Sequence, residues 1–368
     1  MKKHITKMLA VAAISWLGGS AVAQDCAPVQ VSDAPRGGWY GSAGVLVLKQ
    51  VGGSNIAFRT DTYDVPNPNT GSSTLLSRSF TEFDQEYKWS GRFELGVKDK
   101  SGFGLRARYF WFEDQSSINV LDNQGVQDNP VFPGIRENQQ SGLVYSSANP
   151  LGSNMISYGT ADVPSDLTFD RQLKLRALDF DLTGDCCRGN LELTWSAGLR
   201  WLTIEQSYNA RESLLGETAF PDVTPGTQTF TSGHDLTAWG PTVGLEARYG
   251  LTDSLKGFVS GRFGILYAEG NAFSSLLLTT QGDPNNFQVP NAGVQARRCF
   301  AMPNGELEIG GEYSRCIGCD GPVLFVRGSV LSMAFWGAGN AARVNSSNEP
   351  ANEDLILFGF SASVGIRY

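Results

Sequence analysis

Histidine, the side chain best suited to acid–base chemistry near neutral pH, occurs only twice in the 368 residues, at His4 and His234. Asp235 directly follows His234, and such a pair could in principle act as the acid–base couple of a hydrolase. Consecutive residues of a β-strand point to opposite faces, however, so these two side chains are not placed to hydrogen-bond. The sequence also has no cluster of histidine ligands, no nucleophile elbow and no phosphate-binding loop. We therefore expect no enzymatic activity, no metal and no cofactor, with a hydrolase acting at the rim of the fold as a remote alternative.

Six cysteines indicate an oxidising compartment, because an even number of cysteines suits a set of disulfides. Cys316 and Cys319 form a C-x-x-C in "RCIGCDG", a spacing that suits a disulfide, a redox pair or two metal ligands. Their place in a short connection favours a structural disulfide, although the connectivity cannot be deduced. Cys299 maps to the opposite end of its strand. The disulfide candidates are Cys26, Cys186, Cys187, Cys316 and Cys319.

Charged and apolar residues alternate strictly in "YKWSGRFELGVKDKSGFGLRARYFWFE", residues 87–113. Phe93 and Leu95 occupy odd positions there, whereas Arg92 and Glu94 occupy even positions. A period of two predicts β-strands. The same alternation recurs in residues 191–203, 239–250, 255–267, 306–314 and 358–368, and weaker strands are predicted at 39–49, 169–182 and 323–336.

The connections between these ten strands alternate in length and therefore separate the two ends of the fold. One end has only short turns, and the other has long connections rich in Asn, Ser, Gly and Pro. This is the layout of an outer-membrane β-barrel, whereas a soluble β-sandwich does not explain the asymmetry. We predict an all-β, closed antiparallel transmembrane barrel of about ten strands, or twelve if residues 114–168 contain a further hairpin. The short periplasmic turns are 98–102, 183–190, 250–254 and 315–322, and the long extracellular connections are 50–86, 114–168, 206–233, 271–298 and 337–354.

In such a barrel the apolar face of each strand meets lipid and the charged face meets the lumen. The strand at 169–182 changes its apolar phase between Ala177 and Leu178, which we interpret as a β-bulge. The predicted lumen-lining residues are Lys88, Arg92, Glu94, Arg106, Arg108, Arg176, Glu192, Arg200, Glu246, Arg248, Arg262, Glu308 and Glu312, together with Lys174, Lys256, Glu306, Arg327 and Arg367.

The first hairpin folds about "KDKSG", and the apolar faces of its two strands must coincide. We predict a register that sets Trp89 beside Trp111 and Glu94 beside Arg106. Aromatic residues near the loop ends of the strands are expected to form part of an interfacial girdle. The girdle candidates are Trp89, Tyr109, Trp111, Trp201, Trp239 and Tyr267.

The N-terminus has the pattern of a secretory signal, with three lysines, an apolar run from Met8 to Leu17 and a small-x-small end at Ala21-Val22-Ala23. We expect cleavage after Ala23, a periplasmic segment at 24–38 and a barrel at 39–368. The last strand ends in Val364, Ile366 and Tyr368, as expected of a signal for the barrel-assembly machinery. The predicted location is the outer membrane.

The formal charge of −8 falls to −11 once the three lysines of the signal are removed, and a basic surface for nucleic acid is absent. The excess acidity lies in the long connections, where divalent cations could bridge it to lipopolysaccharide. A ten-stranded lumen lies between barrels of about eight strands, which side chains fill, and open porins of roughly 16–18 strands. We therefore expect a narrow pore for small hydrophilic solutes or ions. The alternative is a non-conducting structural or adhesin-like barrel, and the solute and oligomeric state stay open.

Five stretches carry a resemblance to a known family: "ELGVKDKSGFGLRARYFWF", "LELTWSAGLRW", "GPTVGLEARYGL", "GELEIGGEYS" and the terminal "FGFSASVGIRY". Together they resemble the Legionella-type pore-forming outer-membrane protein family, over most of the mature chain. The resemblance implies a pore-type barrel and no catalytic motif.

Overall fold

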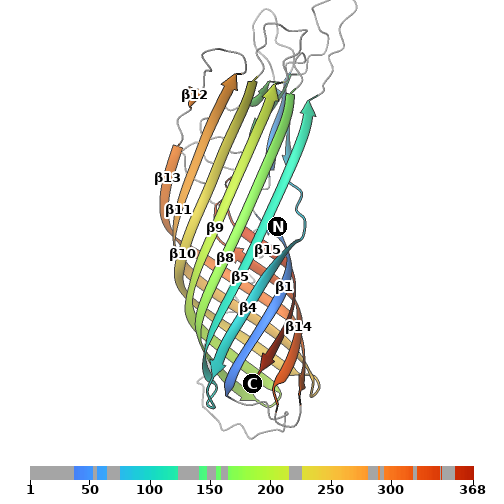
Figure 1. Ribbon diagram of the computed structural model, residues 1–368, viewed down its shortest axis with the longest axis vertical. Coiled ribbons are helices and arrows are strands. Elements are labelled where there is room, and N and C mark those ends of the chain that lie inside the picture. The colour runs from blue at the N-terminus through green and yellow to red at the C-terminus, as the bar shows by residue number, and fades with distance from the viewer. Residues whose placement is uncertain are drawn as a thin grey trace, which may run out of the picture.

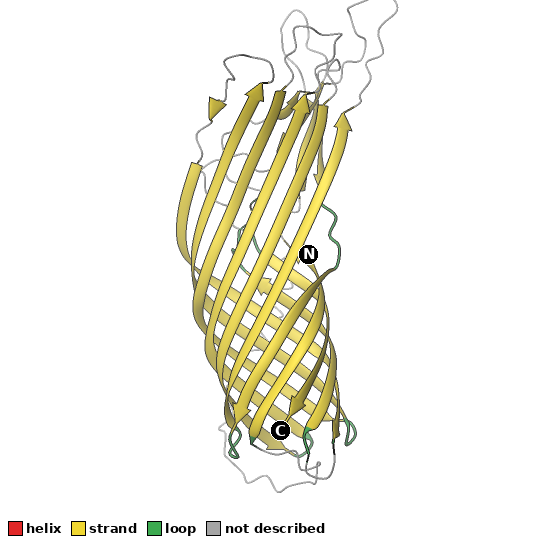
Figure 2. Cartoon of the chain, in the orientation of Figure 1, coloured by secondary structure: helices red, strands yellow, loops and turns green. Residues whose placement is uncertain are grey.

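The structure is a computed structural model in which every regular element is a β-strand (Figure 2). The described part of the chain contains no helix that is long and apolar enough to cross a bilayer. The described residues are 37–52, 56–63, 75–122, 141–146, 155–158, 165–214, 226–280, 289–290, 294–317, 321–339, 341 and 353–368.

Ten antiparallel strands close into a single barrel, which confirms the predicted fold (Figure 1). Each strand pairs with both of its neighbours around the wall, including β10 with β11. The ring is closed by the pairing of the first barrel strand, β1, with the last, β15. The barrel strands are β1 (Gly38–Gly52), β4 (Lys88–Lys98), β5 (Phe103–Asp122), β8 (Ser165–Arg188), β9 (Leu191–Leu214), β10 (Gly226–Gly250), β11 (Leu255–Thr280), β13 (Val294–Cys316), β14 (Val323–Phe335) and β15 (Leu355–Arg367).

The remaining strands come from the connections that the sequence predicts to be long. β2 (Ile56–Tyr63), β3 (Leu75–Glu82), β6 (Ser141–Ser146) and β7 (Met155–Tyr158) form a separate sheet of order β3-β2-β6-β7, in which β2 contacts β8 and β7 contacts β9. β12 (Val289–Pro290) pairs with β11. The twelve-strand alternative is therefore wrong, because β6 and β7 join this second sheet and not the barrel wall.

The register of the first hairpin differs by two residues from the predicted one. Gly91 pairs with Trp111 and Glu94 pairs with Arg108. The ring of Trp111 covers Gly91 so closely that a Cβ on this glycine would lie 1.9 Å from the indole Cη2. The glycine thus makes room for the indole. A shift of two residues keeps the apolar faces together, which is why the pattern alone does not distinguish the two registers.

The turn between β4 and β5 sets this register. The backbone N–H groups of Ser101 and Phe103 donate to Asp99 Oδ1, each at 2.9 Å, and Gly102 takes a φ of 88° that favours glycine. The Ser101 hydroxyl, donating to the Asp99 carboxylate, lowers the pKa of that carboxyl below its usual value.

The predicted bulge in β8 is absent. Pairing with β5 runs without interruption through Ala177 and Leu178, and the odd-numbered side chains of β8 point inward along its whole length. Inward residues nearer the loop end, such as Leu175, are apolar, whereas Asp179 and Asp181 are polar. The apolar phase changes because the surroundings change along the barrel, not because the strand is irregular.

This exchange of faces divides the barrel into two sections. In β9, Leu199 and Trp201 are exposed on the outer face, and Arg200 is buried inside. Beyond Trp201, towards the loop end, the outer residues are polar and the inner ones, Leu202 and Ile204, are completely buried. We call the part with the apolar outer face the membrane section and the part beyond it the upper section.

The upper section exists because six strands of 20 or more residues extend well beyond the length that a bilayer requires. β11 has 26 residues and β10 has 25, whereas a tilted transmembrane strand needs about 9–11. β5, β8, β9, β10, β11 and β13 all extend past the girdle level towards the loop end (Figure 1).

Leu95 and Glu94 test the assignment of the two faces, because the side chains are adjacent and point in opposite directions. Leu95 is 62% exposed on the outer face. The Leu95→Arg change should cost about 2–4 kcal/mol of folding free energy, since it places a charge in the hydrocarbon region. Glu94→Gln should cost much less, because its side chain lies in the lumen and, among the described residues, makes no hydrogen bond or ion pair that the change would break. Denaturant unfolding of both variants in lipid vesicles measures the difference, and equal losses would mean that the faces have been assigned wrongly.

Candidate functional site

A layer of charged side chains fills the lumen of the membrane section. All of its members occupy inward positions, and opposite charges nearly balance: ten cations and nine carboxylates among the described residues. The cations are Arg92, Lys98, Arg106, Arg108, Arg200, Arg248, Lys256, Arg262, Arg327 and Arg367, and the carboxylates are Glu94, Asp179, Asp181, Asp185, Glu192, Glu246, Glu306, Glu308 and Glu312. We call this set the charged layer.

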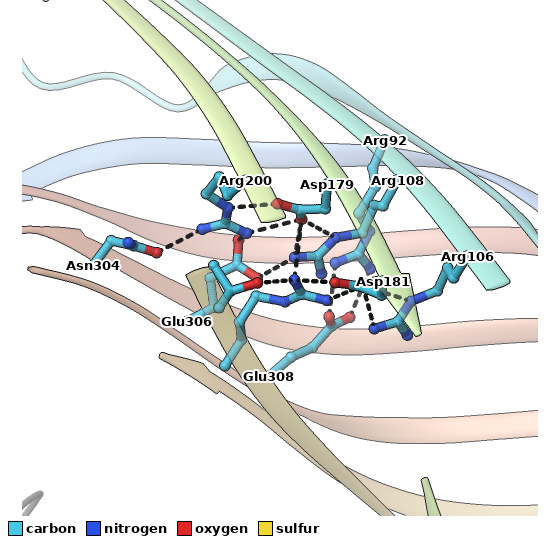
Figure 3. A network of polar contacts seen from close by, with 11 residues as sticks. Arg92, Arg106, Arg108, Asp179, Asp181, Arg200, Asn304, Glu306 and Glu308 are labelled. Atoms are coloured by element: carbon cyan, nitrogen blue, oxygen red, sulfur yellow. Dashed lines mark hydrogen bonds and ion pairs between the residues drawn. The ribbon is translucent and has the colours of Figure 1, made fainter. Parts of the chain in front are cut away.

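Asp179 accepts four guanidinium hydrogen bonds in the charged layer, as many as Asp181 does (Figure 3). The Asp179 carboxylate is 2% exposed and accepts from Arg200 Nε at 2.6 Å, from Arg200 Nη2 at 2.9 Å and from Arg108 Nη2 at 2.8 Å. Arg262 Nη1 lies 3.6 Å away. The negative charge of Asp179 therefore partly compensates the positive charges of three buried guanidinium groups. One of these, Arg262, also donates to Asp181 Oδ1 at 3.0 Å.

Ion pairs cross the lumen in this layer (Figure 3). Arg108 on β5 donates to Glu306 on β13 at 2.6 Å, and β5 and β13 lie at opposite points of the ring of ten strands. Arg92 on β4 makes a bidentate pair with Glu308 on β13, with distances of 2.7 and 2.9 Å. Side chains from opposite walls thus meet, so the lumen is closed at this level in the described conformation.

Nearer the turn end, the charged layer continues with ion pairs of differing burial. Glu312 is fully buried and accepts from Arg327 Nε at 2.6 Å and from Arg367 Nη2 at 2.8 Å. Lys256 pairs with Glu192 at 3.2 Å, and the side chain of that glutamate is 25% exposed.

A second, apolar layer closes the lumen directly above the charged one. Inward side chains of β1, β5, β8, β9, β10, β11, β13, β14 and β15 form a continuous cluster, and Ala338, from the segment after β14, completes it. We call this cluster the apolar collar. Its members are Leu46, Leu48, Phe110, Phe112, Leu173, Leu175, Ala177, Leu202, Ile204, Leu236, Ala238, Leu266, Ala268, Met302, Leu331, Met333, Phe335, Ala338, Leu355 and Leu357.

The segment that supplies Ala338 is held inside the barrel by hydrogen bonds to its wall. The amide of Gln206 both donates to Gly339 O at 3.1 Å and accepts from Ala341 N at 3.0 Å. Ser232 Oγ donates to Ala341 O at 2.6 Å. Gly337 and Gly339 have φ values of 74° and 83°, which favour glycine. We call Gly337–Gly339 together with Ala341 the plug segment.

Most of the predicted lumen residues lie on inward faces, but Arg176 does not. Its side chain is 47% exposed on the outer face, 3.9 Å from Glu113 of β5, and Lys174 lies on the same face. Both assignments followed from the bulge that the structure lacks. The inward predicted residues are Lys88, Arg92, Glu94, Arg106, Arg108, Glu192, Arg200, Glu246, Arg248, Lys256, Arg262, Glu306, Glu308, Glu312, Arg327 and Arg367.

Asp179, Asp181 and Asp185 were missing from the predicted set, although they provide central acceptors. Uninterrupted odd–even alternation in β8 would have found them, since it places all three on the inward face with Leu173 and Leu175.

The predicted girdle residues lie where the outer face changes from apolar to polar. Trp201, Trp239 and Tyr267 form one row across β9, β10 and β11, and the rings of Trp239 and Tyr267 meet edge to face at 6.4 Å. Trp111 stacks on Tyr109 at 5.9 Å. Trp89 is 75% exposed. The two residues expected to pair across the first hairpin, Trp89 and Trp111, are thus displaced by the register shift.

His234 and Asp235 do not form an acid–base couple. His234 is 2% exposed inside the barrel, and Asp235 is exposed on its outer face. A hydrolytic site built on this pair is therefore ruled out by geometry. In the described part of the chain, moreover, no three His, Cys, Asp or Glu side chains gather as metal ligands would.

The cysteine predictions are tested only in part. Cys186 and Cys316, at the turn end, and Cys299, towards the loop end, are exposed free thiols, and Cys26 and Cys319 lie outside the described residues. Disulfides through the latter two therefore stay a prediction, as do the signal peptide and the segment at 24–38. At the C-terminus, Tyr368 stacks on Trp39 at 6.0 Å and Val364 and Ile366 face outward, which puts the three residues of the expected assembly signal on the outer face.

A family model of the Legionella pneumophila major outer membrane protein precursor matches residues 33–367. The chain belongs to this family. It is an outer-membrane β-barrel protein, as the closed ring, the apolar outer belt and the charged lumen indicate. No curated protein matches the chain.

Similar solved structures are also outer-membrane barrels. The outer membrane protease OmpT of Escherichia coli has a TM-score of 0.40 and 11% identity, over 92% of this chain and 98% of that one. The toluene transporter TodX of P. putida has a TM-score of 0.26 and 10% identity, over 92% and 94%. These values reflect a shared barrel architecture and carry no argument about activity.

The Asp179→Asn change should destabilise the barrel by about 3–5 kcal/mol, because it leaves Arg108 and Arg200 buried with too little negative charge. The matched control is Glu113→Gln on the outer face, where an exposed pair contributes less than about 1 kcal/mol. Denaturant unfolding in vesicles compares the two. Similar small losses of folding free energy in both variants would show that the arginines of the charged layer are hydrated and do not depend on Asp179 for compensation.

Proposed function

We propose that the protein is a narrow outer-membrane channel for small ions and hydrophilic solutes that is closed in the described conformation. The observation that carries this proposal is the redundancy of the ion pairs that cross the lumen. Arg108 pairs with Glu306 on the opposite wall and also with Asp179 on the neighbouring strand. Losing the cross-lumen bond therefore does not leave this arginine unpaired.

The same redundancy holds for the acidic partner. Glu306 on β13 lies directly across from Arg262 on β11, so it can exchange Arg108 for a cation of its own wall. Glu308, the partner of Arg92, also accepts from Ser329 Oγ of the adjacent β14 at 2.6 Å. Stripping a buried charge of every partner costs several kcal/mol, about 3–5, whereas an exchange of partners along the wall avoids this cost. The charged layer can thus open a path without creating isolated charges.

Opening also requires the apolar collar to part, which favours a channel that conducts rarely over an open porin. The collar is the observation that supports a second candidate function, a non-conducting barrel that carries its long extracellular connections as a surface-binding structure. Its buried, fully apolar interior resembles the core of a structural element.

We further propose that lipopolysaccharide and outer-membrane lipid surround the apolar belt, that the barrel-assembly machinery reads the outward-facing end of β15, and that the protein is not an enzyme. The support is the position of Val364 and Tyr368, exposed by 56% and 59%, and the separation of His234 from Asp235.

Planar-bilayer recording of the purified protein tests the channel. The wild type should give small, brief and infrequent conductance steps. The double variant Arg108→Ser, Glu306→Ser should give larger steps during open periods, because the charged layer loses one of its cross-lumen bonds while Asp179 keeps Arg200.

The control is the double variant Arg176→Ser, Glu113→Ser, which removes an ion pair of similar type from the outer face. It should conduct like the wild type. If neither the wild type nor the lumen variant gives steps above those of protein-free lipid, the non-conducting barrel is the correct function.

A further inference from the structure

The plug segment packs against a buried histidine of the upper section. His234, on β10, lies beyond the girdle residue Trp239 and outside the membrane section. A Cβ added to Gly339 would lie 2.7 Å from His234 Cε1, so the ring and the plug backbone are in close contact. On the other side, a Cβ on Gly270 of β11 would lie 2.9 Å from Nε2. The ring is thus enclosed between the plug and the wall.

We propose that His234 makes closure of the lumen acid-sensitive: protonation of its imidazole expels the plug segment and removes Ala338 from the apolar collar. The device is a pH switch built from one buried ring and the glycine that covers it. It concerns the position of the plug, so it does not depend on whether the barrel conducts.

The geometry leaves no place for a charge on this ring. His234 is 2% exposed, and its Nδ1 has no hydrogen-bond partner among the described residues. A protonated ring would hold a positive charge and an Nδ1–H donor without an acceptor, and a buried charge of this kind is costly unless it is paired. Movement of Gly339 would admit water to both ring nitrogens.

The groups around the ring do not compensate such a charge. From β13, the inward-facing Arg298 acts on it with the same sign, and its guanidinium lies 4.6 Å from the Phe300 ring. From β9, the cross-strand neighbour is the uncharged Gln206, and from β11 it is Ala272. Glu353, beside β15, accepts a hydrogen bond from Gly339 N through its backbone oxygen at 3.0 Å. It borders, with Asp354 and Arg171, a small cavity of about 10 Å³ next to Gly339.

Burial, helped by Arg298, lowers the pKa of His234 from 6.5 to about 4. In the closed state the ring is neutral, whereas in the released state it regains its ordinary affinity for a proton. A depressed pKa means that the closed state holds its full advantage above pH 6.5 and loses it progressively as the pH falls towards 4. Between pH 7.5 and 5.0 the ratio of closed to released plug should fall roughly 30-fold.

Hydrogen exchange of the full-length barrel in detergent, at pH 7.5 and 5.0, tests the switch. The amides of Gly339 and Ala341 are hydrogen-bonded in the closed state and report directly on release. After correction for the intrinsic pH dependence of exchange, their protection should drop roughly 30-fold at pH 5.0 in the wild type. In His234→Gln, which cannot be protonated, the protection should not change with pH.

The matched control is Asp235→Asn, which removes the titratable neighbour on the outer face of the same strand and should leave the wild-type pH response intact. Should His234→Gln fold poorly, Arg298→Gln provides a second test. Removal of the like charge should make the ring easier to protonate in place, and the loss of protection at pH 5.0 should become smaller. A wild type without a pH response, or a response retained in His234→Gln, would overturn the proposal.

Discussion

Backbone hydrogen bonding inside a hydrocarbon environment is the constraint on which the rest of this structure depends. Lipid offers no partner for an N–H or C=O group, so each strand in the membrane must be paired on both sides. The protein meets this requirement by pairing its first barrel strand with its last and β10 with β11. Closure in turn creates a lumen, and a lumen has to be filled or opened. The charged layer, the apolar collar and the plug segment all fill this lumen.

The side chains that fill the lumen change from charged to apolar along the barrel because the surroundings of its outer face change from lipid to water. In the membrane section the outer face must be apolar, and the same strand alternation leaves its inner face to charges, which are tolerated only when they are paired. Above the girdle the outer face meets water, so the strands carry their polar residues outward and build an apolar core inside, as a soluble barrel does. The two faces of each strand therefore exchange character without any change in backbone geometry, as Ala177 and Leu178 illustrate.

The meeting of these two sections is what limits access through the lumen. Arginines and carboxylates close the membrane section by bonds that have substitutes along the wall. Apolar side chains close the level above it by packing, for which no substitute exists. The plug segment completes the packing from inside with Ala338, and in the described part of the chain it is hydrogen-bonded to Gln206, Ser232, Glu353 and Asp354.

The sequence alone determined the class and the wall of the fold. Period-two alternation, a terminal aromatic strand and connections of alternating length are local or compositional properties, and they specify a ten-stranded outer-membrane barrel. Most lumen residues could be predicted from the odd–even alternation, because successive side chains of a strand point to opposite faces. The register of β4 with β5 did not follow, since shifts by two residues preserve the alternation, and the choice depended on how Trp111 packs over Gly91.

Three features were decided only by the tertiary structure. Arg176 lies outside and Asp179 inside because membrane depth, which no local pattern encodes, decides what each face of β8 must contact. Arg108 meets Glu306 because ring closure brings β5 and β13, almost 200 residues apart in the chain, to opposite walls of one narrow lumen. The plug enters the collar because residues after β14 find space and hydrogen-bond partners inside a closed wall. Each depends on long-range geometry, and sequence spacing carries no measure of the distance across a barrel.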